Sequence, residues 1–141
     1  RSRLRAALDN TPTPIWSIDR EYRLQSANEA FNAVIRHIAH RQPEIGDNVL
    51  EYSVDADARD RWKSWYDSAL LGSVVHGSSR SNIVGMTYAR DHTVSPMRDQ
   101  MGAVYGVSVV SHDVTARIVL TVTEPAHLVF AIAVAAQHKQ P

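Results

Sequence analysis

Apolar residues recur at helical spacing in two stretches of the first half of the chain. The first stretch follows the spacing i, i+3, i+4, i+7 and i+8 and consists of Phe31, Val34, Ile35, Ile38 and Ala39. The same spacing relates the members of the second stretch, Trp62, Trp65, Tyr66, Ala69 and Leu70. Such spacing places apolar side chains on one face of a helix, so two amphipathic helices are predicted.

Polar residues at the ends of these stretches predict where the helices begin and end. Asn28 precedes the first stretch, and an Asn side chain accepts hydrogen bonds from the free amides of a first helical turn. Gly72 follows the second stretch and favours a C-terminal stop. A third, short helix is indicated near the N-terminus by Leu4, Ala7 and Leu8, before the prolines at 12 and 14.

Strands are predicted before the first long helix and after the second. Residues 15–18 and 22–27 form two short apolar runs joined by the polar turn 19–21, as in a β-hairpin. Gly77-Ser78-Ser79 marks a break, after which alternation predicts strands over 82–88, 91–97 and 103–112. Residues 98–102 supply the turn between the last two. This order of elements predicts an α+β fold, a five-stranded antiparallel sheet with helices packed on one face.

Five segments of the chain together resemble the PAS domain family. They are IWSID at 15–19, YRLQSANEAF at 22–31, HTVSPMRD at 92–99, GAVYGV at 102–107 and DVTAR at 113–117. The resemblance implies a sensor module of bacterial histidine kinases, diguanylate cyclases and related regulators. It divides the chain into a leading helix and linker at 1–12, a PAS sensor domain at 13–117 and an atypical extension at 118–141. The extension departs from the family because it carries no heptad pattern that would lead into a coiled coil.

Composition removes several classes of function. Fifteen basic residues balance fifteen acidic ones, so no nucleic-acid-binding surface is expected. The chain has no cysteine, which excludes the flavin–cysteinyl photochemistry of some PAS-like domains. The longest apolar stretch, 128–136, is about half of the ~20 residues that span a bilayer, so no membrane span is expected and the setting is predicted to be cytoplasmic.

Histidines do not favour a haem or metal site. Haem-binding members of the family use a His from the helix before the three final strands, and the corresponding stretch here has none; His76 lies just beyond Gly72. His37 and His40 share one side of a helix without an evident third ligand. Ser111-His112-Asp113 has the letters of a catalytic triad, but adjacent strand residues point to opposite faces, so catalysis there is not expected.

A ligand, if one is bound between the sheet and the helices, is expected to be uncharged or weakly polar. The candidate ligand-binding residues combine aromatic, hydroxyl and apolar side chains and are Trp62, Trp65, Tyr66, Tyr88, Thr93, Ser95, Tyr105 and Val107. An aromatic stripe at helical spacing is also typical of an ordinary core, so both interpretations stay open.

The closing segment suggests how a signal would leave the domain. The resemblance assigns Asp113 and Thr115 to tying the last strand to the exit linker, with Arg117 placed to pair with an acid such as Asp19. Ordinary strand-end capping with a surface ion pair explains the same residues equally well.

The leading hypothesis is a non-catalytic, homodimeric sensor module joined to the effector domain of a two-component kinase or cyclic-di-nucleotide regulator. Two alternatives remain. One is a small cone-fold α+β enzyme resembling ketosteroid isomerases, which would need a buried Asp–His or Asp–Tyr pair with a raised carboxyl pKa. The other is a ligand-free scaffold for protein contacts.

Overall fold

The computed structural model of the chain describes residues 10–83 and 86–114, and the side chains of residues 81–88 are not described. The leading helix predicted before Asn10 and the extension at 118–141 therefore lie outside the described residues. The chain falls into two compact units. One contains the residues up to Gly77 together with His92–Ser111, and the other contains Ser78–Asp91 and the residues from His112 onward.

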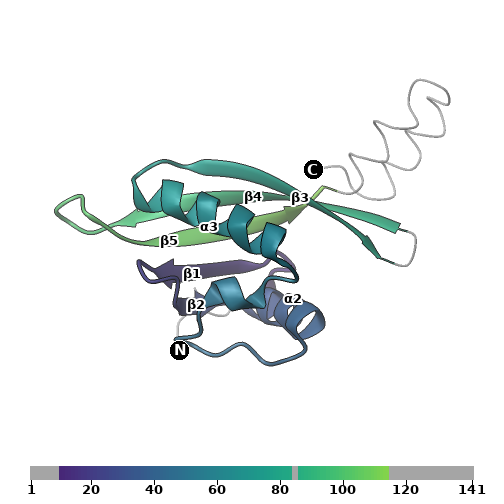
Figure 1. The fold of residues 1–141 in the computed structure, drawn as a ribbon. Helices are drawn as coiled ribbons and strands as arrows, with labels where there is room; N and C mark the ends of the chain where they lie inside the picture. Colours follow the sequence, from purple (N-terminus) through teal and green to yellow (C-terminus); the bar gives the residue numbers. More distant parts are fainter. Residues whose placement is uncertain (1–9, 84–85, 115–141) are drawn as a thin grey trace, which may run out of the picture. The chain divides into compact units, whose positions relative to one another are not determined.

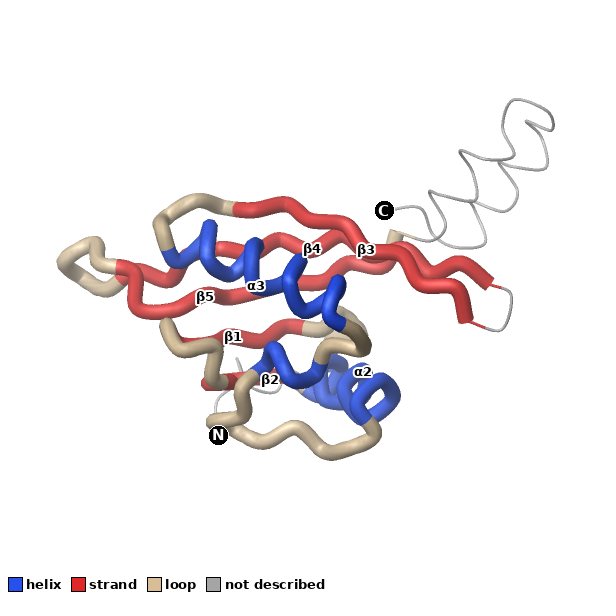
Figure 2. Tube along the Cα trace, viewed as in Figure 1, coloured by secondary structure: helices blue, strands red, loops and turns tan. Residues whose placement is uncertain are grey.

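The elements follow one another in the predicted order. They are β1 (Ile15–Asp19), β2 (Leu24–Ala27), α2 (Glu29–Ala39), the short 3-10 helix η1 (Val49–Tyr52), α3 (Ala56–Leu70), β3 (Val75–Ile83), β4 (Met86–Arg98) and β5 (Val104–Asp113). The strands form one antiparallel sheet in the order β2-β1-β5-β4-β3, and helices pack on one face of it (Figures 1 and 2). The predicted α+β fold is confirmed.

The register of β1 decides which side chains form the core of the first unit. Trp16 lies opposite Ala27 of β2 on one side and Val109 of β5 on the other. Ile18 lies opposite Val107 of β5. Residues directly opposite in an antiparallel pair point to the same face, so Trp16, Ile18 and the two valines form one layer, and all four are buried.

Asn28 joins the start of β1 to the start of α2, beyond the capping role predicted for it. Its side-chain Oδ1 accepts from the backbone N–H of Phe31 and from that of Ile15, each at 3.0 Å. Its Nδ2 donates to the carbonyl of Thr13 at 2.8 Å. Because Asn28 is buried, water cannot replace these bonds if they are lost.

Two aspartates organise the turns of the first unit in the same way. Oδ1 of Asp19 accepts from the backbone N–H of Glu21 at 2.8 Å and of Arg23 at 3.0 Å. Oδ1 of Asp99 accepts from those of Met101 at 2.8 Å and Ala103 at 3.0 Å. The predicted turns at 19–21 and 98–102 are thus confirmed, and the latter needs Gly102, whose φ of +86° is costly for other residues.

Several predicted strand limits were wrong. β3 begins at Val75 rather than at residue 82, so Gly77-Ser78-Ser79 lies inside a strand. β4 is one strand, Met86–Arg98, where two ranges ending at 88 and starting at 91 were expected. β2 starts at Leu24 because Tyr22, with φ of 65°, belongs to the preceding turn. The four-residue η1 was not predicted, since it is too short for a periodic pattern.

The second unit contains its own short-range contacts. The hydroxyl of Ser78 donates to Oδ1 of Asp91 at 3.0 Å, and the backbone N–H of Val114 donates to the carbonyl of Ala89 at 2.9 Å. Burial lowers the pKa of the Arg90 guanidinium, and the negative charge of Asp113 partly offsets that effect. Arg90 and Asp113 are therefore close enough to interact through their charges.

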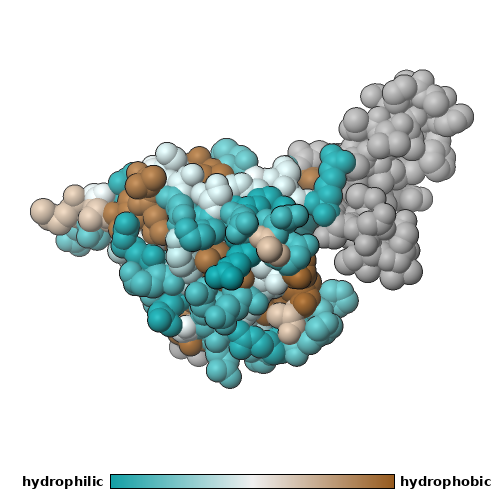
Figure 3. Space-filling model, viewed as in Figure 1, coloured by the Kyte–Doolittle hydropathy of each residue, from teal (hydrophilic) through white to brown (hydrophobic). Residues whose placement is uncertain are grey.

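Polar residues cover most of the face on which α3 lies (Figure 3). Leu71, in the α3–β3 connection, and Met101, in the β4–β5 turn, are apolar residues with 86% and 91% of their surfaces exposed. Arg98 ties these two loops together, donating to the carbonyls of Gly102 at 2.9 Å and Gly72 at 3.2 Å. Within the described part of the chain, no helix is both long enough and apolar enough to cross a membrane.

Replacing Asn28 with Ala is expected to destabilise the protein by about 2–4 kcal/mol in urea-induced unfolding. The substitution removes an N-cap, worth about 1 kcal/mol, and leaves partly buried backbone groups of Thr13 and Ile15 without this partner, at about 1–3 kcal/mol.

Asp55→Ala is the matched control, because exposed Asp55 caps α3 through a single bond from the N–H of Ala58 at 2.8 Å. It should cost only about 1 kcal/mol. Equal losses for the two variants would show that the tie between β1 and α2 adds nothing to the cap.

Candidate functional site

The space between α3 and the sheet in the first unit is filled mainly by aromatic rings. We call Trp16, Phe31, Trp62, Trp65, Tyr66 and His92 the aromatic cluster. Trp16 comes from β1, Phe31 from α2 and His92 from β4, whereas Trp62, Trp65 and Tyr66 come from successive turns of α3. The ring centroids of Trp16 and Phe31 lie 4.6 Å apart, and those of Trp16 and Trp62 lie 5.6 Å apart. These separations are typical of rings in favourable contact.

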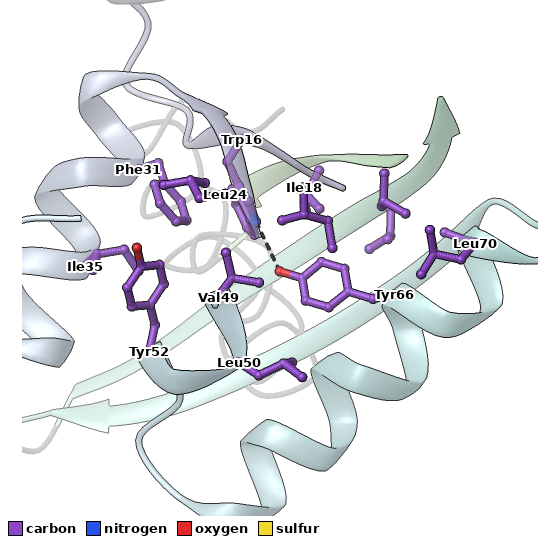
Figure 4. Close-up of a cluster of buried hydrophobic side chains, with 14 residues drawn as sticks. Trp16, Ile18, Leu24, Phe31, Ile35, Val49, Leu50, Tyr52, Tyr66 and Leu70 are labelled. Atoms are coloured by element: carbon purple, nitrogen blue, oxygen red, sulfur yellow. Dashed lines mark hydrogen bonds between the residues drawn. The ribbon is translucent and has the colours of Figure 1, made fainter. Parts of the chain in front are cut away.

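One hydrogen bond fixes the centre of this cluster. The indole N–H of Trp16 donates to the hydroxyl oxygen of Tyr66 at 3.1 Å, as the dashed line in Figure 4 shows. Burial raises the pKa of the Tyr66 hydroxyl, and the bond from Trp16 only partly opposes that rise. Tyr66 therefore stays uncharged across the physiological range, and α3 is held to β1 by a bond between neutral groups.

His92 lies against two tryptophans of α3. Its ring centroid is 4.6 Å from that of Trp62 and 5.6 Å from that of Trp65. The two indoles meet edge to face, with centroids 4.8 Å apart. His92 is only 5% exposed, whereas both indoles are partly exposed. This corner of the cluster is where its aromatic surface reaches solvent.

Trp65 lies directly against the backbone of β3 at Gly77. A Cβ atom added at Gly77 would come within 2.5 Å of Cε2 and Cζ2 of the Trp65 indole. A glycine is therefore needed at this position for the ring to approach the strand so closely. The Arg61 guanidinium carbon lies 5.9 Å from the centroid of the Trp65 ring, within the range of a cation–π contact.

The site offers buried polar atoms but no buried acidic, Lys or Arg side chain among the described residues. Among the described residues, the buried polar side chains are Ser17, Asn28, His92 and Ser111, and none of the buried ones is an Asp, Glu, Lys or Arg. A charged ligand would have to give up its hydration without an ion-pair partner, which is costly. The arrangement therefore suits a molecule that is uncharged and largely aromatic or apolar.

Two Asp–Tyr pairs flank the aromatic cluster, and both keep their carboxylates charged. The Tyr22 hydroxyl donates to Asp67, and Lys63 Nζ donates to the other oxygen of Asp67 at 2.9 Å. The Tyr52 hydroxyl donates to Asp47 at 2.6 Å. Burial alone would raise the pKa of each aspartate, but the hydrogen bonds and the neighbouring positive charges outweigh it, so both pKa values lie below the ordinary 3.8.

Sequence comparison agrees with this architecture. A family model described as "PAS domain" matches residues 2–69 of the chain. The matched residues include β1, β2, α2, η1 and most of α3. Over these residues the chain matches the PAS family. A search of curated proteins found no significant match.

Solved structures share the fold of this PAS domain over most of its length. The PAS domain of Bordetella pertussis BvgS is 20% identical, with 78% of this chain and 82% of that chain aligned and a TM-score of 0.58. A sensory box sensor histidine kinase from Vibrio cholerae is 22% identical, with 78% and 85% aligned and a TM-score of 0.54. VqmA of Vibrio cholerae, bound to DPO, is 20% identical, with 82% of this chain but only 60% of VqmA aligned, and a TM-score of 0.64. At these identities the likeness establishes the fold.

The structure brings some of the predicted ligand-binding residues together. Tyr66 and Val107 belong to the buried core, and Trp62 and Trp65 pack against it. Thr93 and Ser95 are half-buried and alternate along β4 with the buried His92 and Val94. Tyr105 is 54% exposed, and the side chain of Tyr88 lies outside the described residues.

The proposed exit residues are only partly described. Asp113 is the last residue of β5 and is exposed, while Thr115 and Arg117 lie outside the described residues. Asp19, the suggested partner of Arg117, uses its carboxylate to hold the β1–β2 turn.

The histidines considered at first lie on the surface. His37 and His76 are exposed on α2 and β3, and exposed His40 caps the end of α2. Across residues 10–83 and 86–114, no group of three or more His, Asp or Glu side chains is arranged to hold a metal ion.

Sequence reasoning did not place His92, Trp16 or Phe31 among the site residues, and for His92 a signal was present. His92 lies two residues before Val94, so the two side chains point to the same face of the strand. Val94 is the only aliphatic residue of the run 92–95, and its position indicates which face turns inward. Applied to this run, the same rule would have selected His92 rather than Thr93 and Ser95.

Asp47→Asn is expected to destabilise the protein by about 1–2 kcal/mol at pH 7, with the loss shrinking as the pH falls to 3. The pKa of Asp47 is lowered in the folded state, so the stabilisation from its carboxylate is complete above about pH 4 and disappears as the group protonates below it. Urea unfolding at the two pH values measures the effect.

Glu51→Gln, an exposed acid on η1, serves as the control and should change stability little. A loss for Asp47→Asn that is as large at pH 3 as at pH 7 would contradict the charge-based explanation.

Proposed function

We propose that this PAS domain is the signal-input module of a larger signalling protein and binds an uncharged small molecule against the aromatic cluster. The observation that carries the proposal is the cluster itself: aromatic rings, partly open to solvent at Trp62 and Trp65, in a core whose described buried residues include no Asp, Glu, Lys or Arg. Such a surface gives a flat or apolar molecule much contact area without desolvating an ion.

Relatives in fold support a role in sensing. PAS domains are typical of signal-sensing modules, and a sensor histidine kinase is among the structures of similar fold. VqmA has been solved both with DPO and with a ligand and DNA. This chain aligns with 60% or less of VqmA, so we assign the present domain ligand binding and not DNA binding, in keeping with its balanced charge.

We also propose that the domain works as a homodimer in a cytoplasmic histidine kinase or cyclic-di-nucleotide regulator. Leu71 and Met101 give a second copy two apolar side chains to bury, on loops that Arg98 holds together. VqmA, with a similar fold, is described as a dimer.

The proposed role is non-catalytic. An isomerase of the cone-fold type needs a carboxyl group whose pKa is raised towards neutrality so that it can act as a base. The carboxyl groups of both Asp–Tyr pairs beside the cluster have lowered pKa values instead. A ligand-free scaffold remains the second candidate, since the same aromatic rings also pack well against one another.

Native mass spectrometry of freshly purified protein, with an absorption spectrum, is expected to show a dimer that retains a small molecule. Leu71→Glu should shift the protein towards monomer while the molecule stays bound, because Leu71 lies outside the aromatic cluster.

Ser73→Glu is the control for added charge, since exposed Ser73 lies in the same loop without an apolar side chain. A dimer without any retained or added ligand would favour the scaffold, and a monomer in wild type would contradict the proposed dimer.

Asp113→Ala in the full-length protein is expected to uncouple output from input, with at least a fivefold loss of the signal-dependent response. The proposal rests on the place of Asp113 at the end of β5 and on its charge interaction with Arg90. Arg90→Ala should have the same effect, whereas Asp91→Asn, at a half-buried residue that contacts Ser78 on β3, should not. An unchanged response in Asp113→Ala would leave ordinary strand-end capping as the explanation.

A further inference from the structure

The Trp65 ring occupies a place that the rest of the structure prepares for a flat aromatic group. On one side lies the backbone of β3 at Gly77, which has no side chain. A Cβ atom added there would lie 2.5 Å from two carbons of the indole and would overlap the ring. On other sides, the rings of Trp62 and His92 have centroids 4.8 Å and 5.6 Å away. The space is shaped by a missing side chain and by two rings, so it fits a planar occupant.

Trp65 is held in this place without a directional bond. Trp16 donates its indole N–H to Tyr66, but the structure records no hydrogen bond from the indole of Trp65 to another described residue. Its ring is partly exposed at the surface of the core. Turning the ring out to solvent would therefore cost packing contacts but no hydrogen bond.

The charged group recorded beside this place also suits an aromatic occupant. The charged side chain recorded against the Trp65 ring is Arg61, which is exposed and lies at 5.9 Å in cation–π range. A guanidinium in this position is attracted to any aromatic face, so it could make the same cation–π contact with an incoming ring as it makes with Trp65. Any second aromatic ring placed here would meet the same neighbours.

We propose that the space filled by the Trp65 ring against Gly77 is a subsite for a planar, uncharged aromatic ring. A ligand bound there would displace the Trp65 side chain. A ligand enters by exchanging one ring for another, so contact with Gly77, Trp62 and His92 is kept while Trp65 moves outward. The inference deepens the proposed function, because it names the ligand class and makes the position of Trp65 report on occupancy. It also predicts that Trp65 competes with the ligand, which lowers apparent affinity in wild type.

Indole is the probe for this subsite, measured by isothermal titration and ligand-observed NMR. Trp65→Ala opens the space and is expected to bind indole at least tenfold more tightly than wild type. Adding Gly77→Ala to Trp65→Ala places a methyl group where the ring would lie and should weaken binding at least tenfold. Cyclohexanol, a non-planar ring, should bind Trp65→Ala at least tenfold more weakly than indole.

Ser73→Thr in the Trp65→Ala background is the control, since it adds a methyl group at an exposed residue outside the aromatic cluster. It should leave indole binding unchanged. Binding that does not differ between wild type and Trp65→Ala, or that ignores Gly77→Ala, would overturn the inference.

Gly77→Ala alone tests the displacement of Trp65 even if Trp65→Ala fails to fold. The added methyl group should push the indole outward, giving a red-shifted tryptophan emission and stronger acrylamide quenching while the circular dichroism of the fold is kept. Unfolding of this variant, or an unchanged emission, would show that the Trp65 ring cannot move away from residue 77 in the folded protein.

These measurements use a probe and not the natural ligand, so they separate the two proposals. Absence of any retained or added ligand in wild type would count against the proposed function alone. A bound natural ligand whose affinity is unaffected by Gly77→Ala would count against the subsite alone.

Discussion

The first unit of this PAS domain depends on packing the aromatic rings of α3 against the sheet around Trp16. That residue is the second of β1, touches Phe31 of α2 and Trp62 of α3, and donates a hydrogen bond to Tyr66. The bond is neutral and buried, so salt and pH do not weaken it within the physiological range. Helix, strand and candidate site are thus positioned by the same set of rings.

A core built in this way links stability to function. Rings that pack well against one another also present faces to a small planar molecule, which can adopt the same offset or edge-to-face arrangements. The directional contacts lie around the cluster: Asn28 ties β1 to α2, and the Asp47–Tyr52 and Asp67–Tyr22 pairs lie at its flanks. In the proposed function, this frame stays in place while the partly exposed corner at Trp62 and Trp65 responds to the ligand.

Local physical rules predicted most of the fold but only part of the candidate site. Asn28 and the apolar stripes on α2 and α3 act locally, so spacing and capping preferences were enough to locate the helices. Gly77 was interpreted as a break between elements. A glycine inside a strand can instead mark the close approach of another group, but the sequence does not show that this group is Trp65. His92 was missed because a polar residue in an alternating run gives no sign of burial until its neighbours on α3 are in place.

The central claim is that the signal enters at the partly exposed tryptophans of α3. Its most direct test is fluorine NMR of protein labelled with 5-fluorotryptophan, which gives one resonance for each of the three tryptophans. Removing the retained molecule should shift the Trp62 and Trp65 resonances strongly and that of Trp16 little. Three resonances that are identical with and without the molecule would contradict the account.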